Sequence, residues 1–242
     1  MQHPNSAIIF IVAPGSDPGS MTVVKSFDRV DFLRAEVAQA IIEHARACVE
    51  NRGSFNLAVS GGSLIHHLAS SHLSSHAGQN WNVYLVDERM VPQDNLDSNY
   101  GTLRKAFEGT NFGAAVNWLP VPIDENLDVS RAAQSYQSLL PDHLDMCLLG
   151  MGPDGHTASL FPNHPDFDVE DKRICIPIRN SPKPPPERIS LTIPYLNATS
   201  KRMFVVTGDH LKKKIFETVI SGKSDLPASY IYDPTWFVNF TS

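Results

Sequence analysis

Short apolar runs alternate with amphipathic stretches along most of the chain, and this alternation limits the possible folds more than any other feature of the sequence. Each apolar run has the length of a strand and leads into a bend, often with glycine. The stretch that follows repeats its apolar residues at helical spacing. Such alternation predicts the α/β class, with a mostly parallel sheet covered by helices on both faces.

The predicted elements extend from residue 28 to residue 220. Strands are predicted at 55–60, 82–88, 144–150, 173–178, 188–193 and 202–208. Helices are predicted at 28–50, 63–73, 98–107, 129–140, 156–160 and 209–220. The Pro-rich stretch 181–186 is too short for a domain linker, so we expect a stiff loop inside one domain. That this loop moves on substrate binding is a hypothesis.

Length, charge and cysteine content restrict the class of partner. A chain of 242 residues and 26.7 kDa can build one large domain, which we place at 21–242. The net charge of −6 disfavours nucleic-acid and anionic-membrane partners, because both favour a basic surface. Cys48, Cys147 and Cys175 are widely spaced and odd in number, which favours a reducing compartment, the cytoplasm. A monomer or a small homo-oligomer is expected.

Residues 1–20 are expected to be an N-terminal extension or an expression tag. The apolar run at 7–13 follows no Lys or Arg and is too short to cross a bilayer, so no signal peptide is expected. The stretch "GSDPGSM" at 15–21 is typical of a linker, and Met21 would then be the natural start. Mass spectrometry of the native N-terminus tests this expectation, which the presence of residues 1–20 would contradict.

Unusual clusters of side chains follow four of the predicted strands. They lie at 60–63, 87–89, 150–156 and 208–209. In a parallel sheet with helices on both faces, ligands bind at the carboxyl ends of the strands, where loops lead into helices. We therefore expect one edge of one sheet to bring all four clusters into a single pocket.

The first cluster, Ser60, Gly61, Gly62 and Ser63, lies between a strand and a helix. Glycines let the backbone approach an anion, and a helix start offers free N–H groups and a favourable dipole. The cluster predicts a phosphate site, although it lacks the Lys-Ser/Thr of a P-loop and the spacing of a dinucleotide motif. The alternative is a plain turn capped by Ser63.

The second cluster, 87–89, puts three charged residues at the rim of the sheet. Arg89 can bind a phosphate through the planar fork of its guanidinium. Asp87 can orient this arginine or contact sugar hydroxyls. The alternative is a solvated strand end with a surface ion pair.

The third cluster carries the most specific chemistry. Gly152, between Gly150 and Gly155, leaves room for a ligand close to the backbone. Asp154 is expected to cap the helix at 156–160, and His156 to lie in its first turn, where the dipole favours a neutral imidazole that can act as a general base. The alternative gives these two residues only capping and packing roles. The convergence of three anion-binding loops favours the catalytic interpretation.

Basic side chains complete the predicted site. Lys212, Lys213 and Lys214 lie early in a predicted helix, where the dipole does not favour cations, so one of them is expected to face an anion. Lys183 and Arg188 precede or begin a strand, where contact with a ligand at the rim and a simple role in solubility both fit.

No metal and no cofactor are expected. His143, His156 and His164 lie at no recognised ligand spacing, and the chain has no HExxH motif. The adjacent His66 and His67 are expected at the surface or in packing.

Six motifs resemble those of 6-phosphogluconolactonases in type and order. They are SGGS, DERMVPQDNLDSNYG, LLGMGPDGHTASLFP, SPKPPPERISLT, VVTGDHLKKK and LPAS, within about residues 25 to 235. The resemblance implies a three-layer α/β/α sandwich of Rossmann-like type. It also implies hydrolysis of the sugar-phosphate lactone 6-phospho-D-glucono-1,5-lactone to 6-phospho-D-gluconate, the second step of the oxidative pentose phosphate pathway, without a cofactor.

Two departures from the family pattern affect the binding residues. The family usually continues its glycine motif with Thr-Pro, where this chain has Leu64 and Ile65, so backbone N–H groups would have to hold the phosphate. The family's lysine usually lies three residues after the glycine of the TG motif, where this chain has Leu211. A one-residue insertion assigns the role to Lys212, because the apolar spacing that follows then matches.

The resemblance also separates lactone hydrolysis from two alternatives. Glucosamine-6-phosphate deaminases resemble DEY where this chain has Arg89, and they carry Glu at the position of Phe161. Without that Glu, ring opening and amine departure lose a proton carrier. A non-catalytic sugar-phosphate sensor would be expected to have a damaged Asp154/His156 pair or an attached DNA-binding segment, and the sequence shows neither.

The expected mechanism is general-base hydrolysis. The 6-phosphate lies against Gly61, Gly62, Arg89 and Lys212, while His156 takes a proton from the water that attacks C1. Asp154 positions the histidine or a hydroxyl of the substrate. Backbone N–H groups at 152–155 are expected to form an oxyanion hole.

Overall fold

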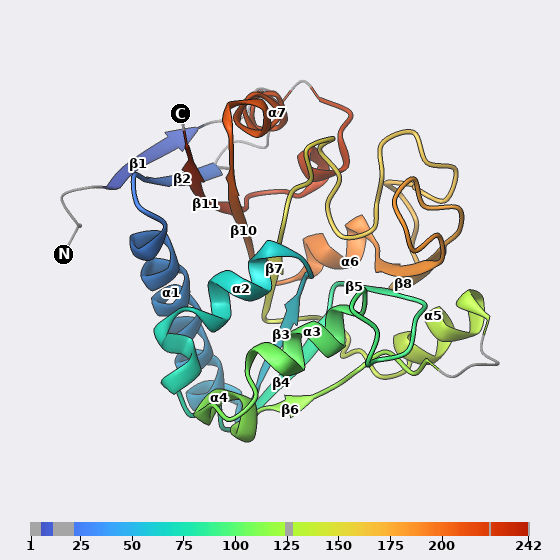
Figure 1. Cartoon of the computed structure of the whole chain (residues 1–242), viewed down its shortest axis with the longest axis horizontal. Coiled ribbons are helices and arrows are strands. Elements are labelled where there is room, and N and C mark those ends of the chain that lie inside the picture. Colours follow the sequence, from blue (N-terminus) through green and yellow to red (C-terminus); the bar gives the residue numbers. More distant parts are fainter. Residues whose placement is uncertain (1–5, 12–21, 124–127, 223, 242) are drawn as a thin grey trace.

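The computed structural model describes residues 6–11, 22–123, 128–222 and 224–241. Its main sheet has eight strands in the order β1-β2-β11-β10-β7-β3-β4-β6 (Figure 1). Neighbouring strands are parallel except β1 and β2, which are antiparallel. The mostly parallel sheet is confirmed. Its strands are β1 Ser6–Ile11, β2 Thr22–Phe27, β3 Phe55–Val59, β4 Trp81–Leu85, β6 Asn117–Trp118, β7 Met146–Leu149, β10 Lys201–Gly208 and β11 Thr235–Phe240.

A second, antiparallel sheet of three strands lies beside the main one. It consists of β5 Asp87–Arg89, β9 Arg188–Leu191 and β8 Cys175–Ile178, in that order. The prediction of a single sheet and of one strand at 82–88 is therefore wrong. The chain changes sheets at Val86, whose N–H donates to Val59 of β3 at 3.0 Å and whose carbonyl accepts from Leu191 of β9 at 2.9 Å.

Four of the predicted helices form with shifted ends: α1, α3, α5 and α7. The helix predicted at 63–73 is split into α2 and a short 3₁₀ turn, η1. The sequence did not predict α4, α6 or the 3₁₀ turn η2. The bounds are α1 Val30–Arg52, α2 Ser63–Ala69, η1 His72–Ser75, α3 Asn99–Ala106, α4 Asn111–Ala115, α5 Val129–Gln137, α6 Ile193–Ala198, α7 His210–Ile220 and η2 Pro227–Tyr230.

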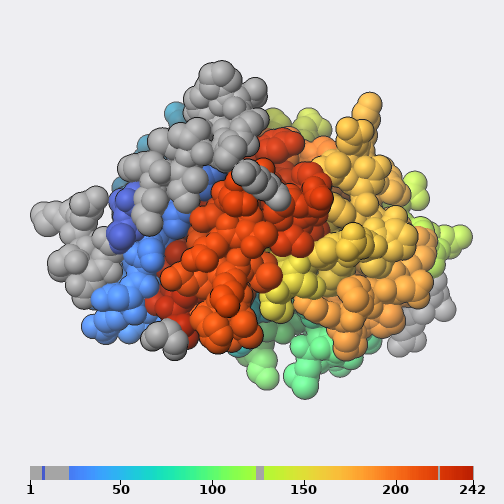
Figure 2. Space-filling model, turned by 90° about the horizontal axis from the view of Figure 1, so that it is seen from above, coloured from blue at the N-terminus to red at the C-terminus, as the bar shows by residue number. Residues whose placement is uncertain are grey.

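Residues 156–160, all of them described by the structure, form a tight turn and no helix, so this prediction is wrong. Ala158 has a φ of 52°, in the left-handed region, and Thr157 pairs with Leu160 in an isolated bridge. An α-helix of L-residues accommodates neither feature. The preceding Gly155 instead accepts a hydrogen bond from Ala228 of η2 at 3.1 Å. In Figure 2 these two segments form adjoining yellow and red surfaces.

Helices cover both faces of the main sheet, as two consecutive residues of β11 show. Trp236 and Phe237 point to opposite faces because side chains alternate along a strand. Trp236 packs against Phe216 of α7, with ring centroids 5.1 Å apart. Phe237 lies 5.2 Å from the ammonium of Lys25, which pairs with Glu36 of α1 at 3.6 Å. Helices α7 and α1 therefore form outer layers on opposite faces of the sheet.

Part of the predicted N-terminal extension belongs to the main sheet. Residues 6–11 form β1, which pairs with β2 from Ser6 opposite Phe27 to Ile11 opposite Thr22. Residues 12–21, which include the whole stretch 15–21 that is typical of a linker, lie outside the described residues, so that expectation stays a prediction. Within the described ranges, no helix combines the length and the apolar character needed to cross a membrane.

Candidate active site

One pocket of about 150 Å³ opens where β3, β7 and β10 end and where the small sheet begins. Three of the four strand-end clusters predicted from the sequence, 60–63, 87–89 and 150–156, contribute to its lining, and two sheets rather than one supply them. Residues 208–209 do not line it, although Lys212 of the helix that follows them does. Asp154 lies beside the pocket rather than in its lining. The predicted site residues that line it are Ser60, Gly61, Gly62, Ser63, Asp87, Arg89, Gly152, His156, Arg188 and Lys212.

Residues 60–63, called the Gly turn below, form a wall of the pocket without a side-chain cap. Gly62 has a φ of 71° and is the N-cap of α2, so Ser63 is the first helical residue and does not cap the helix. A Cβ on Gly61 would lie 1.8 Å from Oδ1 of Asn99, so glycine is needed there. The hydroxyl of Ser60 is buried and has no hydrogen-bond partner among the described residues. The start of α2 therefore faces the pocket with backbone N–H groups that no capping side chain occupies.

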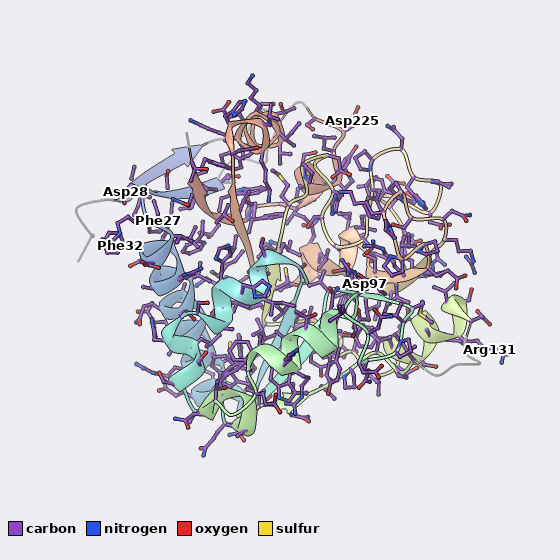
Figure 3. The ribbon with its side chains drawn as sticks, viewed as in Figure 1. Phe27, Asp28, Phe32, Asp97, Arg131 and Asp225 are labelled. Atoms are coloured by element: carbon purple, nitrogen blue, oxygen red, sulfur yellow. The ribbon has the colours of Figure 1, made fainter. Side chains whose placement is uncertain are left out.

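Arg89 has most of its guanidinium available to a ligand. One N–H of Nη1 donates to the carbonyl of Asp97, which is labelled in Figure 3, at 2.8 Å. Its Nε is buried and has no partner in the described part of the chain. A guanidinium carries five N–H donors, so Arg89 can bind an anion in the pocket through several of them.

Glu88 stabilises the helix after the pocket rather than the ligand. Its side chain is buried, and its carboxylate accepts from the backbone N–H groups of Arg89, Asn99 and Tyr100, each at 2.8 Å. The hydroxyl of Ser98 also donates to it, at 3.2 Å. Burial raises the pKa of Glu88, and the three N–H bonds partly oppose this shift. The first turn of α3 is thus held by a buried acid.

Asp87 is linked through Ser159 to Arg188 and not to Arg89, so only the second of its two expected roles, contact with sugar hydroxyls, stays a prediction. Its Oδ2 accepts from the hydroxyl of Ser159 at 2.7 Å. That hydroxyl accepts in turn from Nη1 of Arg188 at 3.4 Å. Both charged side chains are buried. Burial, and then the nearby charge of Arg89, lower the pKa of Arg188.

Arg188 holds residues 181–186, called the proline loop below. Its Nε donates to the carbonyl of Pro185 at 3.1 Å. Its Nη2 donates to the carbonyls of Lys183 at 2.9 Å and Pro184 at 2.8 Å. Together with the bond to a serine hydroxyl, these contacts occupy four of the five N–H donors of the guanidinium. Arg188 is therefore mainly a clamp on this loop, with one N–H left for a ligand.

His156, Asp154 and Lys183 form one cluster at the pocket. Nδ1 of His156 contacts Oδ1 of Asp154 at hydrogen-bonding distance. The ammonium of Lys183 lies 3.2 Å from Oδ2 of Asp154 and 3.2 Å from Nδ1 of His156. The imidazole packs on the ring of Phe161, with centroids 4.7 Å apart. A Cβ on Gly152 would lie 2.0 Å from the imidazole, so glycine lets the ring lie against the backbone.

The charge of Asp154 assigns the tautomer of His156. Burial by itself raises the pKa of Asp154, but the hydrogen bond with His156 and then the charge of Lys183 bring this pKa well below its usual range. A carboxylate only accepts hydrogen bonds, so Nδ1 of His156 carries the proton between them. The lone pair is then on Nε2. Asp154 caps no helix and instead orients the histidine.

The structure distinguishes the three consecutive lysines. Lys212 lines the pocket, whereas Lys213 and Lys214 are exposed. Lys213 pairs with Glu217 along the helix at 4.0 Å. A Cβ on Gly208 would lie 2.7 Å from Cδ of Lys212, so the glycine lets the lysine stem cross the end of β10. Burial lowers the pKa of Lys212.

The oxyanion hole expected at 152–155 does not form from its glycines. The N–H of Gly152 donates to the carbonyl of His156 at 2.9 Å. The N–H of Gly155 donates to the carbonyl of Gly152 at 3.0 Å. Each of these N–H groups has a single proton, which the turn itself uses, so this expectation is wrong for both glycines.

His67 is a packed residue, one of the two roles expected for it. Its Nε2 lies 3.1 Å from the hydroxyl of Thr207, and its Nδ1 accepts from Nε of Arg34 at 3.4 Å. Burial, followed by the charge of Arg34, lowers the pKa of His67 to about 4. Among the described residues, no group of three or more His, Cys, Asp or Glu side chains could hold a metal ion.

The residue-by-residue interpretation of the sequence missed Ser159 and Asn99 as contributors to the site, and it gave Lys183 only a contact at the rim or a role in solubility. Ser159 links Asp87 to the clamp on the proline loop. Asn99 contacts the Gly turn and donates to the carbonyl of Asp87 at 2.8 Å. Lys183 reaches the acid–histidine pair. All three lie inside motifs already noted, and that position in a motif was the available signal.

The α/β fold, with an acid–histidine pair and several cations at the ends of its strands, defines a class of small-molecule enzyme, and comparison with known proteins gives the family. Residues 28–237 match the family described as glucosamine-6-phosphate isomerases/6-phosphogluconolactonase. The chain belongs to this family.

Several relatives and solved structures found by comparison are named 6-phosphogluconolactonases. The rat 6-phosphogluconolactonase (Rattus norvegicus) is 36% identical, over 92% of this chain and 91% of its own length. The human protein is 34% identical, over 92% of each chain. The fold is similar to that of 6-phosphogluconolactonase from Trypanosoma brucei, with a TM-score of 0.74, 22% identity, and coverage of 89% of this chain and 95% of that one.

Proposed function

We propose that the chain hydrolyses 6-phospho-D-glucono-1,5-lactone to 6-phospho-D-gluconate, the second step of the oxidative pentose phosphate pathway. The observation that carries this proposal is the meeting of two kinds of group in one pocket. An acid–histidine pair able to move a proton lies beside Arg89, Lys212 and the Gly turn, which can bind a phosphate. The full-length similarity to the rat and human 6-phosphogluconolactonases supports the same substrate.

The phosphate of the substrate binds at the Gly turn, between Arg89 and Lys212. The free N–H groups at the start of α2 and the uncommitted donors of Arg89 suit a dianion. Leu64 replaces the family's usual Thr and offers no hydroxyl, so backbone donors and cations supply the binding energy. Ser60 and Gly152 lie where they can contact the sugar.

His156 acts as a general base through Nε2. Nε2 takes a proton from water, the water oxygen attacks C1, and the carbonyl electrons move to its oxygen. When this intermediate collapses, the bond between C1 and the ring oxygen breaks, and His156 returns the proton to the leaving oxygen. The product acid then releases a proton to solvent. The N–H groups of Gly152 and Gly155 are occupied within their turn, so these two groups do not receive the charge that develops on the carbonyl oxygen.

The test is turnover of fresh lactone, followed by proton release and corrected for spontaneous hydrolysis. His156→Ala is expected to lower kcat by about 10²–10⁴-fold, the usual contribution of a general base, with an unchanged fold by circular dichroism. The exposed His72 supplies the matched control, and His72→Ala is expected to keep full activity. Near-wild-type turnover by His156→Ala would exclude the assigned role.

Two other outcomes would identify the rival functions. Ammonia release from glucosamine 6-phosphate would indicate a deaminase, which the buried Phe161 at the position of that family's Glu disfavours. Tight binding of 6-phosphogluconate with neither activity would indicate a sensor.

The cytoplasmic location, the absence of a nucleic-acid partner and the monomeric or small homo-oligomeric state are part of the same proposal. Their support is the net charge of −6 and the absence of a cysteine-rich motif in the sequence. Cell fractionation and light scattering on the purified protein test them. Two related rice proteins are named as chloroplastic, so fractionation must include plastids where the source has them.

A further inference from the structure

The proline loop places a cation against the acid–histidine pair. The ammonium of Lys183 is 3.2 Å from Asp154 and 3.2 Å from the imidazole of His156, and it lies 5.8 Å from the centroid of the Phe161 ring. Lys183 does not line the pocket, and its side chain is 39% exposed. Its ammonium therefore contacts the acid–histidine pair from outside the lining of the pocket.

Only one arrangement of protons gives the Lys183 ammonium, the Asp154 carboxylate and Nδ1 of His156 a hydrogen-bond partner each. Nδ1 of His156 meets both a carboxylate, which only accepts, and an ammonium, which only donates. If Nδ1 donates to Asp154, Lys183 is satisfied by the second carboxylate oxygen, Oδ2, at 3.2 Å. If Nδ1 instead accepts from Lys183, Oδ1 of Asp154 faces the ring with no hydrogen between them. The first arrangement leaves the lone pair on Nε2.

The backbone fixes the place of Lys183. Its own carbonyl and that of Pro184 accept from Nη2 of the buried Arg188. The N–H of Ser181 donates to the carbonyl of Pro186 at 2.9 Å and closes the loop. The ammonium thus extends from a tightly held backbone, which is how a charge is placed with precision.

We propose that Lys183 is a positioning residue: its ammonium holds the Asp154 carboxylate so that Asp154 accepts from Nδ1 of His156 and Nε2 stays free to accept a proton. The kinetic consequence rests on the proposed function. The tautomer of His156 does not depend on it. Lys183 acts through Asp154 and makes no contact with the reacting atoms.

The kinetic test compares Lys183→Met, Lys183→Arg and a control on an unrelated surface, Lys213→Met. Lys183→Met is expected to lower kcat for the lactone by about ten- to a hundredfold, because a misaligned catalytic group costs a factor of this order. Its KM is expected to stay within about threefold of wild type, because the phosphate contacts remain. Lys183→Arg keeps a cation near Asp154 and is expected to recover most of the lost turnover. Lys213→Met is expected to match wild type.

Two kinetic results would overturn the proposal. A rise in KM with an unchanged kcat would mean that Lys183 binds substrate directly. Unchanged kinetics in Lys183→Met would mean that it has no role in turnover.

A measurement without substrate separates this proposal from the proposed function. In protein with ¹⁵N-labelled histidine, NMR is expected to show a histidine in the Nδ1–H tautomer whose signal His156→Ala removes. In Lys183→Met this signal is expected to move toward a mixture of the two tautomers. An unchanged signal would overturn the positioning role even if turnover falls. If the wild-type protein does not hydrolyse the lactone, the proposed function fails, and the NMR result still decides the role of Lys183.

Discussion

The Gly turn and the proline loop border the same site, yet they are shaped in opposite ways. The Gly turn requires a glycine at residue 61, because there is no room for a Cβ beside Asn99. The proline loop requires a large side chain, because the guanidinium of Arg188 lies between the loop carbonyls and donates hydrogen bonds to them. We therefore expect a larger side chain to disturb the Gly turn and a loss of side-chain donors to disturb the proline loop.

The largest effect is expected from Arg188→Met. This change removes the donors to the proline loop and to Ser159, and it leaves the buried Asp87 without its nearest linked cation. The free energy of unfolding is expected to fall by about 3 kcal/mol, as when one partner of a buried charged network is lost. Urea unfolding followed by circular dichroism measures it.

The matched control is Arg131→Met, on α5 at the edge of the molecule in Figure 3. Among the described residues Arg131 pairs only with Asp128, and both side chains are largely exposed, so the expected loss is below about 0.5 kcal/mol. Similar losses for Arg188→Met and Arg131→Met would show that the proline loop does not depend on its clamp.

The next effect is expected from Lys212→Met, which removes a cation from the side of the pocket that includes the Gly turn. KM for the lactone is expected to rise by about tenfold or more, since a hydrogen bond to a charged group contributes about 1.5–3 kcal/mol. Steady-state kinetics measure this change. The neighbouring exposed Lys213 gives the comparison, and equal effects of Lys212→Met and Lys213→Met would contradict the assignment.

A smaller effect is expected from Gly61→Ala. The new Cβ would displace the amide of Asn99, which then loses its 2.8 Å bond to the carbonyl of Asp87, at a cost of about 1 kcal/mol. Urea unfolding of Gly61→Ala, Asn99→Ala and the double variant forms a cycle. The double variant is expected to lose less than the sum of the single losses. Strict additivity would mean that Asn99 is not the cause.

The smallest effect is expected from Asp154, which makes the free energy of unfolding depend on pH. The pKa of Asp154 lies well below its usual range in the folded protein, so the unfolded chain binds the proton more readily. The stabilisation is therefore fully present above about pH 4, the ordinary range of this group, and is lost as the pH falls toward the folded pKa. Because 37% of the side chain is exposed, the effect should stay below about 1 kcal/mol.

Unfolding of wild type and Asp154→Asn in urea at pH 7 and pH 3 tests this sign. The difference in the free energy of unfolding is expected to be smaller at pH 3. A larger difference at pH 3 would contradict a lowered pKa for Asp154.

The sequence predicted the centre of the main sheet, β10, β7, β3 and β4, because its signal is local, but it did not predict β1, β2, β6 or β11. The apolar runs 55–60 and 202–208 each lead into glycine, and the predicted helices between them repeat their apolar residues. The small sheet was missed because the sequence of a strand does not show which other strand it pairs with. The run 82–88 looks continuous, and only hydrogen bonds to distant strands divide it at Val86. The helix at 156–160 failed because this stretch makes contacts with distant residues, such as those of Ser159 with Asp87 and Ser190, which the local sequence does not show.

The site could be predicted where it consists of motifs at strand ends. It could not be predicted where it depends on contacts between side chains and residues outside their own motif. The positions of His156 and the Gly turn in one pocket followed from the parallel sheet. The family resemblance singled out Lys212 among three lysines, and the structure places its side chain over Gly208 in the lining of the pocket. The clamp by Arg188 could not be anticipated, because its partners are backbone carbonyls, which every residue carries.

The two backbone hydrogen bonds of Val86 affect how rigid the substrate site is. Its N–H is fixed to β3, which leads into the Gly turn, while its carbonyl is fixed to β9, which begins at Arg188. A single residue thus couples the phosphate wall of the pocket to the strand that holds the proline loop. The two walls are expected to keep their separation in the absence of substrate. The enzyme would then bind its lactone in a preorganised site and would not need to close one domain upon another.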